Sequence, residues 1–276
     1  MKKSTQLIAM FVLSLATAAH SQTARHPDPA MEQVAREAKL QYVGAASPDS
    51  TTTCSFNFTT GTGNKFMKYC VTANGNIVQF ESPSGHEYIN TGTIGEGYAF
   101  CDYDSSTQYY DYAGYGDSGN WKAPVTVSSS ATSVKISRTT SDGIFTLTQT
   151  IAQNAGNELV QITMALKNNA TTSHHVGLLR YADVDVDGFS SNSFDYTYRT
   201  AWGYNEGGYG LQLEFLSGSA FNGAFSQDIS GGPNSCQIFE YVLGPLQNTD
   251  GSIFAEYDME LGKKGTGTVE VAYKAF

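Results

Sequence analysis

The fold is decided by a hairpin that reads Val134-Lys-Ile-Ser-Arg138, then the turn Ser141-Asp142-Gly143, then Phe145-Thr-Leu-Thr-Gln-Thr-Ile151. Apolar residues take alternate positions in both arms, and an extended strand places alternate side chains on one face. An Asp-Gly pair between two such arms is a strong hairpin signal. The stretch therefore predicts two antiparallel strands that each bury one face.

The same signals recur on both sides of this hairpin. Short apolar runs are separated by clusters of Gly, Asn, Asp and Ser, and no glycine motif for nucleotides or strand–helix alternation interrupts them. We expect further strands at Ile77–Glu81, Val160–Leu166, Val176–Asp183, Gly210–Leu216, Ile238–Leu243 and Thr268–Phe276. The sequence thus predicts an all-β domain over residues 50–276, with antiparallel sheets packed face to face as a β-sandwich.

The start of the chain has the three parts of a secretory signal peptide. Lys2 and Lys3 precede the apolar run Leu7–Ala18, and small residues surround a cleavage site after Ser21. The apolar run has about a dozen residues, fewer than the ~20 that a membrane-spanning helix needs. We therefore expect residues 1–21 to be removed from a bacterial exported protein that is secreted or periplasmic and not membrane-spanning.

Residues 22–49 differ in composition from the β-rich remainder of the chain. Pro27 and Pro29 precede the only clear helix-forming stretch after the signal, in which Val34, Ala38 and Tyr42 fall on one helical face. We interpret this segment as a linker with a short helix that leads into the domain. An alternative is an interaction segment that docks on a partner.

The composition limits the partners. Removing two lysines with the signal leaves 14 Lys plus Arg (16 less 2) against 26 Asp plus Glu, a net charge of about −12. Such an acidic chain disfavours nucleic acid and anionic membranes, and it accepts cations, basic partners or neutral ligands such as glycans. The low charged fraction of 15%, with 28 Gly and 17 Tyr, is typical of extracellular β-proteins.

Four cysteines in an exported chain favour two disulfides. Cys54 and Cys70 end two seven-residue arms around a glycine turn, so a hairpin there would place them opposite each other. Cys101 and Cys236 would pair by elimination and join distant parts of the chain. A zinc site is the alternative, but no Cys-x-x-Cys spacing supports it.

Three aspartates alternate with valines in Leu178-Leu-Arg-Tyr-Ala-Asp-Val-Asp-Val-Asp-Gly188. In an extended strand Asp183, Asp185 and Asp187 would share a face, where their like charges need a cation, an arginine or solvent. Asp-x-Asp-x-Asp-Gly opens a calcium loop, although Phe194 stands where an EF-hand places its closing acid. The run predicts a calcium site, with a solvated acidic turn as the alternative.

Aromatic residues gather with acids between residues 98 and 121. Aromatic faces stack on sugar rings, and carboxylates accept hydrogen bonds from sugar hydroxyls. The alternative is that these rings pack on the core. The candidate ligand-binding residues are Tyr103, Tyr109, Tyr110, Tyr112 and Trp121, with Trp202 from a second stretch of similar composition.

The segment from Val134 to Asp183 resembles galactose-mutarotase-like supersandwich domains in its succession of strands, through Glu158-Leu-Val-Gln-Ile-Thr-Met-Ala-Leu-Lys-Asn-Asn169 and Val176-Gly-Leu-Leu-Arg-Tyr181. It also resembles exported bacterial proteins of unassigned function. The first resemblance implies a supersandwich fold, as in aldose epimerases, polysaccharide lyases and some glycosidases. Epimerase chemistry would need a histidine acid and a glutamate base. His174 and His175 stand in a polar turn and no glutamate matches, so no catalytic residue is carried over.

These patterns predict a secreted β-sandwich that binds an extracellular carbohydrate-like ligand, with calcium as a possible stabiliser. One alternative is a carbohydrate-active enzyme, either a lyase, an epimerase or a glycoside hydrolase, for which Glu96, Glu206 and Glu214 are among the acids available. Another is a cell-surface or matrix protein. The patterns leave open whether the chain is an enzyme, which ligand it binds and its oligomeric state.

Overall fold

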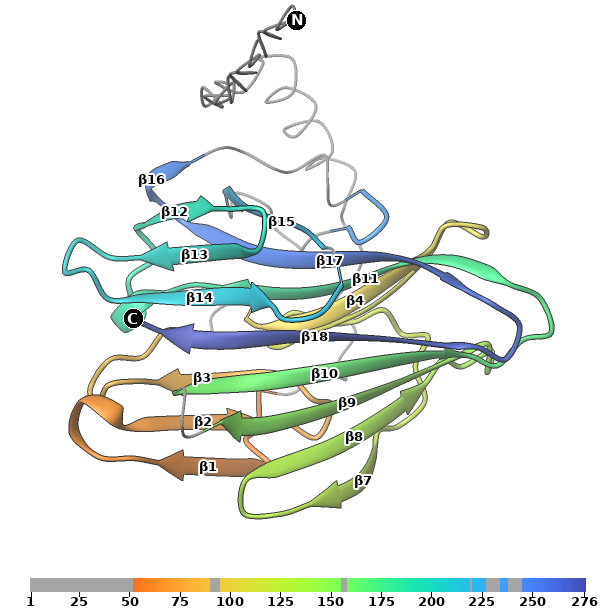
Figure 1. Cartoon of the computed structure of the whole chain (residues 1–276), viewed down its shortest axis with the longest axis horizontal. Helices are drawn as coiled ribbons and strands as arrows, with labels where there is room; N and C mark the ends of the chain where they lie inside the picture. Colours follow the sequence, from red (N-terminus) through yellow and green to blue (C-terminus); the bar gives the residue numbers. More distant parts are fainter. Residues whose placement is uncertain (1–51, 90–94, 155–157, 219, 227–233, 238–244) are drawn as a thin grey trace, which may run out of the picture.

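The computed structural model describes residues 52–89, 95–154, 158–218, 220–226, 234–237 and 245–276. Antiparallel strands in three sheets form nearly all the regular structure there (Figure 1), with two single 3-10 turns, Gly63–Lys65 and Val186–Gly188. The predicted all-β, antiparallel fold is confirmed. No helix among these residues is long and apolar enough to cross a membrane. The predicted signal peptide, the helical linker and the strand at residues 238–243 lie outside the described ranges.

The largest sheet has nine strands in the order β16-β12-β13-β14-β18-β10-β9-β8-β7. Buried and half-buried residues alternate along β8, β9 and most of β10, as a sheet with one face on the core requires. The strands are β7 (Val125–Ser129), β8 (Ser133–Thr139), β9 (Phe145–Asn154), β10 (Leu159–Asn168), β12 (Asn192–Tyr196), β13 (Thr200–Tyr204), β14 (Gly210–Phe215), β16 (Leu246–Thr249) and β18 (Thr266–Ala275). The predicted hairpin forms β8 and β9.

The second sheet has six strands in the order β15-β17-β11-β4-β5-β6. They are β4 (Gly97–Asp102), β5 (Thr107–Tyr112), β6 (Gly116–Asp117), β11 (His174–Asp183), β15 (Phe221–Ser226) and β17 (Gly251–Leu261). Its inner side chains share one hydrophobic core with the nine-stranded sheet, and the rings of Phe100 and Phe145 meet there with centroids 5.1 Å apart. The two sheets therefore form the sandwich.

A small sheet of β1 (Phe56–Thr60), β2 (Met67–Val71) and β3 (Ile77–Glu81) joins the same core. The ring of Phe80 lies edge-on to that of Tyr273 in β18, with centroids 6.4 Å apart. The carbonyl of Gly75, in the turn between β2 and β3, accepts a 3.3 Å hydrogen bond from Arg180. The small sheet is thus fixed to both larger sheets.

The structure contains the disulfides Cys54–Cys70 and Cys101–Cys236. The predicted register of the first hairpin is wrong, because Asn57 and not Cys54 lies opposite Cys70. Residues 61–66 connect the strands with a 3-10 turn and shift the register by three residues. Cys54 precedes β1 and still reaches Cys70.

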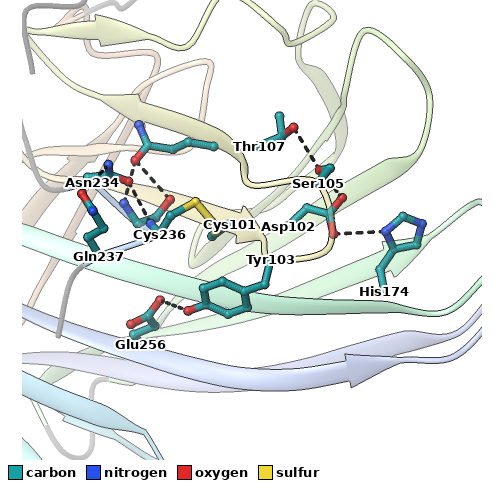
Figure 2. The surroundings of a disulfide bond; sticks show 12 residues. Cys101, Asp102, Tyr103, Ser105, Thr107, His174, Asn234, Cys236, Gln237 and Glu256 are labelled. Atoms are coloured by element: carbon teal, nitrogen blue, oxygen red, sulfur yellow. Dashed lines mark hydrogen bonds and ion pairs between the residues drawn. A yellow bond between two sulfur atoms is a disulfide. The ribbon is translucent and has the colours of Figure 1, made fainter.

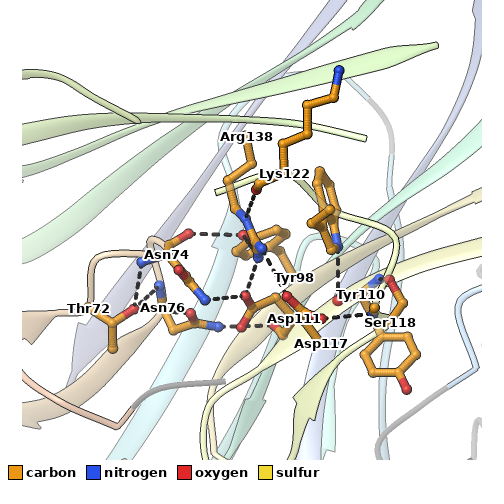
Figure 3. Close-up of polar contacts among 12 residues, drawn as sticks. Thr72, Asn74, Asn76, Tyr98, Tyr110, Asp111, Asp117, Ser118, Lys122 and Arg138 are labelled. Atoms are coloured by element: carbon orange, nitrogen blue, oxygen red, sulfur yellow. Dashed lines mark hydrogen bonds and ion pairs between the residues drawn. The ribbon is translucent and has the colours of Figure 1, made fainter. Parts of the chain in front are cut away.

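Two buried ion-pair networks lie between the sheets. Arg138 of β8 donates to Asp111 and Asp117, and Asn74 donates to Asp111 over 2.7 Å (Figure 3). Arg180 of β11 pairs with Glu96, which is fully buried, and desolvation raises the pKa of Glu96 to about 7. Because a buried charge is stable only when it is paired, these groups serve the core. Glu96 is therefore not a surface acid available to a ligand.

Candidate functional site

The central strand β11 separates two faces of the six-stranded sheet. Its alternate residues Val176, Leu178 and Ala182 lie in the core shared with the nine-stranded sheet. The residues between them point the other way, because side chains alternate across a strand. We call this second side the outer face; it carries His175, Gly177, Leu179, Tyr181 and Asp183 from β11.

Aromatic rings line up across the outer face. Tyr110 and Tyr112 of β5 stack with ring centroids 5.3 Å apart, and the ring of Tyr112 lies 5.4 Å from that of Tyr181. Phe254 of β17 is the cross-strand partner of Tyr181. We call these four residues the aromatic strip. Gly97 separates Tyr112 from Tyr181 in the register, and a Cβ there would approach the carbonyl of Asp111 to 2.1 Å. The rings can approach one another because this position has no side chain.

One end of the strip carries four polar residues that we call the Tyr103 group: Tyr103, His175, Glu256 and Asp258. The Tyr103 hydroxyl donates to Glu256 Oε1 over 3.1 Å, beside the Cys101–Cys236 disulfide (Figure 2). His175 lies with its ring 4.8 Å from that of Tyr103 and pairs with Asp258. Tyr103 is half-buried, whereas the side chains of His175 and Asp258 are exposed.

The carboxyl group of Glu256 is buried among these residues. Desolvation raises the pKa of Glu256 to about 8, so at neutral pH it carries a proton that it can donate. Gly177 provides the room for this arrangement, because a Cβ there would come within 2.4 Å of both Glu256 Oε1 and the Tyr103 hydroxyl. The Tyr103 group therefore combines a ring, a protonated acid and an exposed His–Asp pair.

The other end of the strip carries three acids that we call the Asp183 group: Asp183, Asp185 and Asp250. One oxygen from each lies within 4.8 Å of the others. Desolvation, followed by the charges of Asp185 and Asp250, raises the pKa of Asp183 to about 9; desolvation and Asp250 raise that of Asp185 to about 6. Ser252 Oγ connects this end to the strip, because it lies 2.9 Å from the Tyr181 hydroxyl and 3.5 Å from Asp183 Oδ1.

A second group that could hold a metal ion consists of Asp102, Asp104 and His174, which lie where β4 ends and β11 begins. His174 Nδ1 is 3.1 Å from Asp102 Oδ1, and Ser105 donates to the other oxygen of Asp102 over 2.6 Å (Figure 2). In the described part of the chain, acidic groups suited to a cation are therefore present at both ends of β11.

The structure distributes the predicted aromatic residues over several places. Tyr103, Tyr110 and Tyr112 come together on the outer face. Tyr109 and Trp121 pack in the core with ring centroids 6.0 Å apart, so both are accounted for as core residues. Trp202 is half-buried on the opposite sheet, where its cross-strand partners are Asp195 and Gln212.

The predicted acidic run is also divided. Asp183 and Asp185 belong to the Asp183 group, whereas the carboxylate of Asp187 lies 3.0 Å from His86 Nδ1 and accepts from the backbone N–H of Glu87 over 3.3 Å. The 3-10 turn Val186–Gly188 ends the extended backbone and turns Asp187 away.

Sequence reasoning missed Tyr181, Asp250, Ser252 and Glu256. Glu256 does follow a signal, since it alternates with the apolar residues Ala255 and Tyr257 in a strand, and Tyr181 lies within the run Val176–Asp183 that predicts a strand. Their proximity to the tyrosines of β5 depends on the order of strands in the sheet, which has no local signal.

The fold and the outer face describe a β-sandwich of supersandwich type. No family model matches the chain, and no curated protein matches it. A bacterial glucoamylase complexed with acarbose has a similar structure, with a TM-score of 0.55 and 11% identity over 84% of this chain. This chain spans about a third (34%) of the glucoamylase's length.

Two further solved structures align with most of this chain, and the alignment spans nearly all of each of those proteins. A putative aldose 1-epimerase from Escherichia coli K12 has 10% identity and a TM-score of 0.46 over 80% of this chain and 99% of its own. A galactose mutarotase related enzyme from Lactobacillus acidophilus has 8% identity and a TM-score of 0.49 over 80% and 97%. At 11% identity and a TM-score of 0.55, the similarity to the glucoamylase is one of fold.

Proposed function

We propose that this protein is exported and binds a neutral carbohydrate-like ligand at the Tyr103 group. The observation that carries the proposal is the contact between the half-buried Tyr103 ring and the buried Glu256. A sugar presents an apolar face to a ring and hydroxyls to polar groups, and this end of the outer face offers both. The net charge of −10 favours a neutral ligand over an anionic one.

The aromatic strip supports the Tyr103 group as part of the same sheet. Tyr112 and Tyr181 are fully buried, so they act as a rigid base and not as contact surfaces. The fold shared with a glucoamylase that was solved with acarbose also supports a saccharide ligand. Two disulfides fit the proposed location outside the cytoplasm, and the proposal includes a calcium ion that stabilises the domain of residues 50–276.

Calorimetric titration of the purified protein with a panel of neutral oligosaccharides tests this proposal. We expect Tyr103→Ala to weaken binding of the ligand that emerges by about tenfold, which corresponds to ~1.4 kcal/mol. Tyr198→Ala is the matched control, because Tyr198 is the most exposed tyrosine in the described residues and lies in the turn between β12 and β13. Equal effects of the two variants, or no binding in the panel, would contradict the proposal.

A carbohydrate-active enzyme is the second candidate. Glu256 is protonated at neutral pH, and Asp258 lies two residues further on the same face, about 7 Å along β17. In inverting glycosidases the two carboxyl groups lie roughly 6.5–9.5 Å apart, a separation that side chains two residues apart on one face of a strand can reach. In this candidate Glu256 protonates the leaving oxygen and Asp258 activates water. Release of reducing sugar that Glu256→Gln abolishes, with oligosaccharide binding retained, would establish it; binding without any turnover would leave a binding protein.

A surface for assembly is the third candidate, and β7 favours it. This strand lies at the edge of the nine-stranded sheet, all its residues are exposed, and Val125 and Val127 are among them. An exposed edge strand can pair with another chain. Light scattering of the wild type and Val127→Lys would reveal such pairing as an oligomer that only the wild type forms.

A further inference from the structure

The Asp183 group brings together residues that are distant in sequence. Asp183 ends β11, Asp185 follows it, and Asp250 lies between β16 and β17. Asp183 is the cross-strand partner of Ser252, and the backbone N–H of Val184 donates to the carbonyl of Gly251 over 3.3 Å. The sheet register therefore places the three carboxylates side by side, with one oxygen of each within 4.8 Å of the others.

One of these carboxylates has an oxygen without a partner. Asp185 is 9% exposed, and its Oδ1 is buried without a hydrogen bond. An unsatisfied buried polar atom is costly, and more so when it is charged. In the described part of the chain, no lysine or arginine forms an ion pair with Asp183 or Asp185. The unsatisfied oxygen of Asp185 therefore has no positively charged side chain paired with its carboxylate.

A neighbouring amide adds a second unsatisfied oxygen. Asn192 is buried, and its Nδ2 donates over 3.0 Å to the carbonyl of Val184, the residue between Asp183 and Asp185. Its own Oδ1 is buried without a hydrogen bond. Carboxylate and amide oxygens are the ligands that calcium prefers, and calcium accepts the six to eight oxygens of an irregular site.

We infer that Asp183, Asp185 and Asp250 together bind one calcium ion. This inference rests on the proposed function only in that it names the site of the stabilising ion. The site differs from a loop formed by the Asp-x-Asp-x-Asp run, because the carboxylate of Asp187 is engaged by His86 and the backbone of Glu87. Asp250 takes the place of the third aspartate of the run.

The ion would join two strand ends that otherwise meet through backbone contacts. Its carboxylate ligands lie at the end of β11 and just before the start of β17, two neighbouring strands that contribute Tyr181 and Phe254 to the aromatic strip. Ser252 continues this connection to the Tyr181 hydroxyl at 2.9 Å. Calcium therefore stabilises the base on which the Tyr103 group is built.

The test is calorimetric titration of the metal-stripped, full-length exported chain with calcium chloride alone, with magnesium chloride as the ion control. We expect one calcium per chain, no magnesium binding at equal concentration, and a calcium-dependent rise in melting temperature. Asp185→Asn and Asp250→Asn should each weaken calcium binding at least tenfold. Asp187→Asn is the matched control from the same run, and it should change the affinity less than twofold.

Two results would overturn the inference: a wild-type protein that binds no calcium, or an Asp187→Asn loss as large as that of Asp185→Asn. Asp250 is exposed, so its asparagine variant keeps the test valid if Asp185→Asn does not fold. Because no sugar is present, failure here is separate from failure of the proposed ligand binding.

Discussion

Replacing Glu256 by glutamine removes an ionisable group without removing its hydrogen bond. Glutamine Oε1 can accept from the Tyr103 hydroxyl as the carboxyl oxygen does. Burial raises the pKa of Glu256 from 4.5 in the unfolded chain to about 8 in the fold. Below pH 4.5 both states are protonated. Above it the unfolded chain releases a proton that the folded protein keeps, so stability falls as pH rises towards 8.

The size of the effect follows from the pKa difference. Between pH 4.5 and 7, about 2.5 pH units at 1.36 kcal/mol each correspond to a loss of ~3 kcal/mol that the glutamine variant avoids. Near pH 4 the free energies of unfolding of the two proteins should differ only by an offset that does not depend on pH. Glu256→Gln should then gain about 3 kcal/mol at pH 7, or roughly 6–12 °C in melting temperature.

Urea denaturation of both proteins at pH values from 4 to 8 measures this gain. Glu260→Gln is the matched control: Glu260 lies on the same face of β17 but is exposed, so its effect should stay within about 0.5 kcal/mol at every pH. A difference between wild type and Glu256→Gln that does not change with pH would refute the reasoning. Other buried acids titrate equally in both proteins and cancel.

Three further perturbations test the fold that supports the site. Arg138→Met should destabilise the protein by about 3–5 kcal/mol in urea denaturation, because it leaves the buried carboxylates of Asp111 and Asp117 unpaired. Gly177→Ala should cost about 1–3 kcal/mol, since the new Cβ separates the hydroxyl–carboxyl pair beside it; an unchanged stability and an unchanged tyrosine environment by ultraviolet absorption would contradict this. Cys236→Ser should cost about 4–5 kcal/mol by removing a cross-link over 135 residues, and addition of reductant should then have less effect on the variant than on the wild type.

The strands could be predicted because their signal is local. Ile77–Glu81 matches β3, and the runs from Val134, Phe145, Val160 and Val176 all fall inside observed strands. The alternation of apolar and polar residues within each run predicts a strand without any knowledge of its neighbours. The register of the first hairpin failed because a turn of helix replaced the expected three-residue glycine turn, which the glycine spacing did not reveal.

The candidate site was only partly predictable, because it depends on which strands are neighbours. Alternation along β5 places Tyr109 and Tyr110 on opposite faces, but it does not say which face meets the core. Asp250 joins Asp183 across 67 positions because β11 pairs with β17. The stretch around Trp202 has a composition like that of residues 98–121, and yet Trp202 lies on the other sheet. Stretches of similar composition can therefore lie far apart, because strand pairing and not composition determines where they lie.

The position of β18 determines when the nine-stranded sheet can form. This strand pairs with β14 on one side and β10 on the other, with four strands beyond it in each direction. Every other described strand precedes it in the chain, so a ribosome has made two separate four-stranded ribbons before it makes the strand that joins them. Until then each ribbon has an open edge. The nine-stranded sheet can therefore be completed only once residues 266–275 have been made, which gives its two halves a contact of high sequence separation.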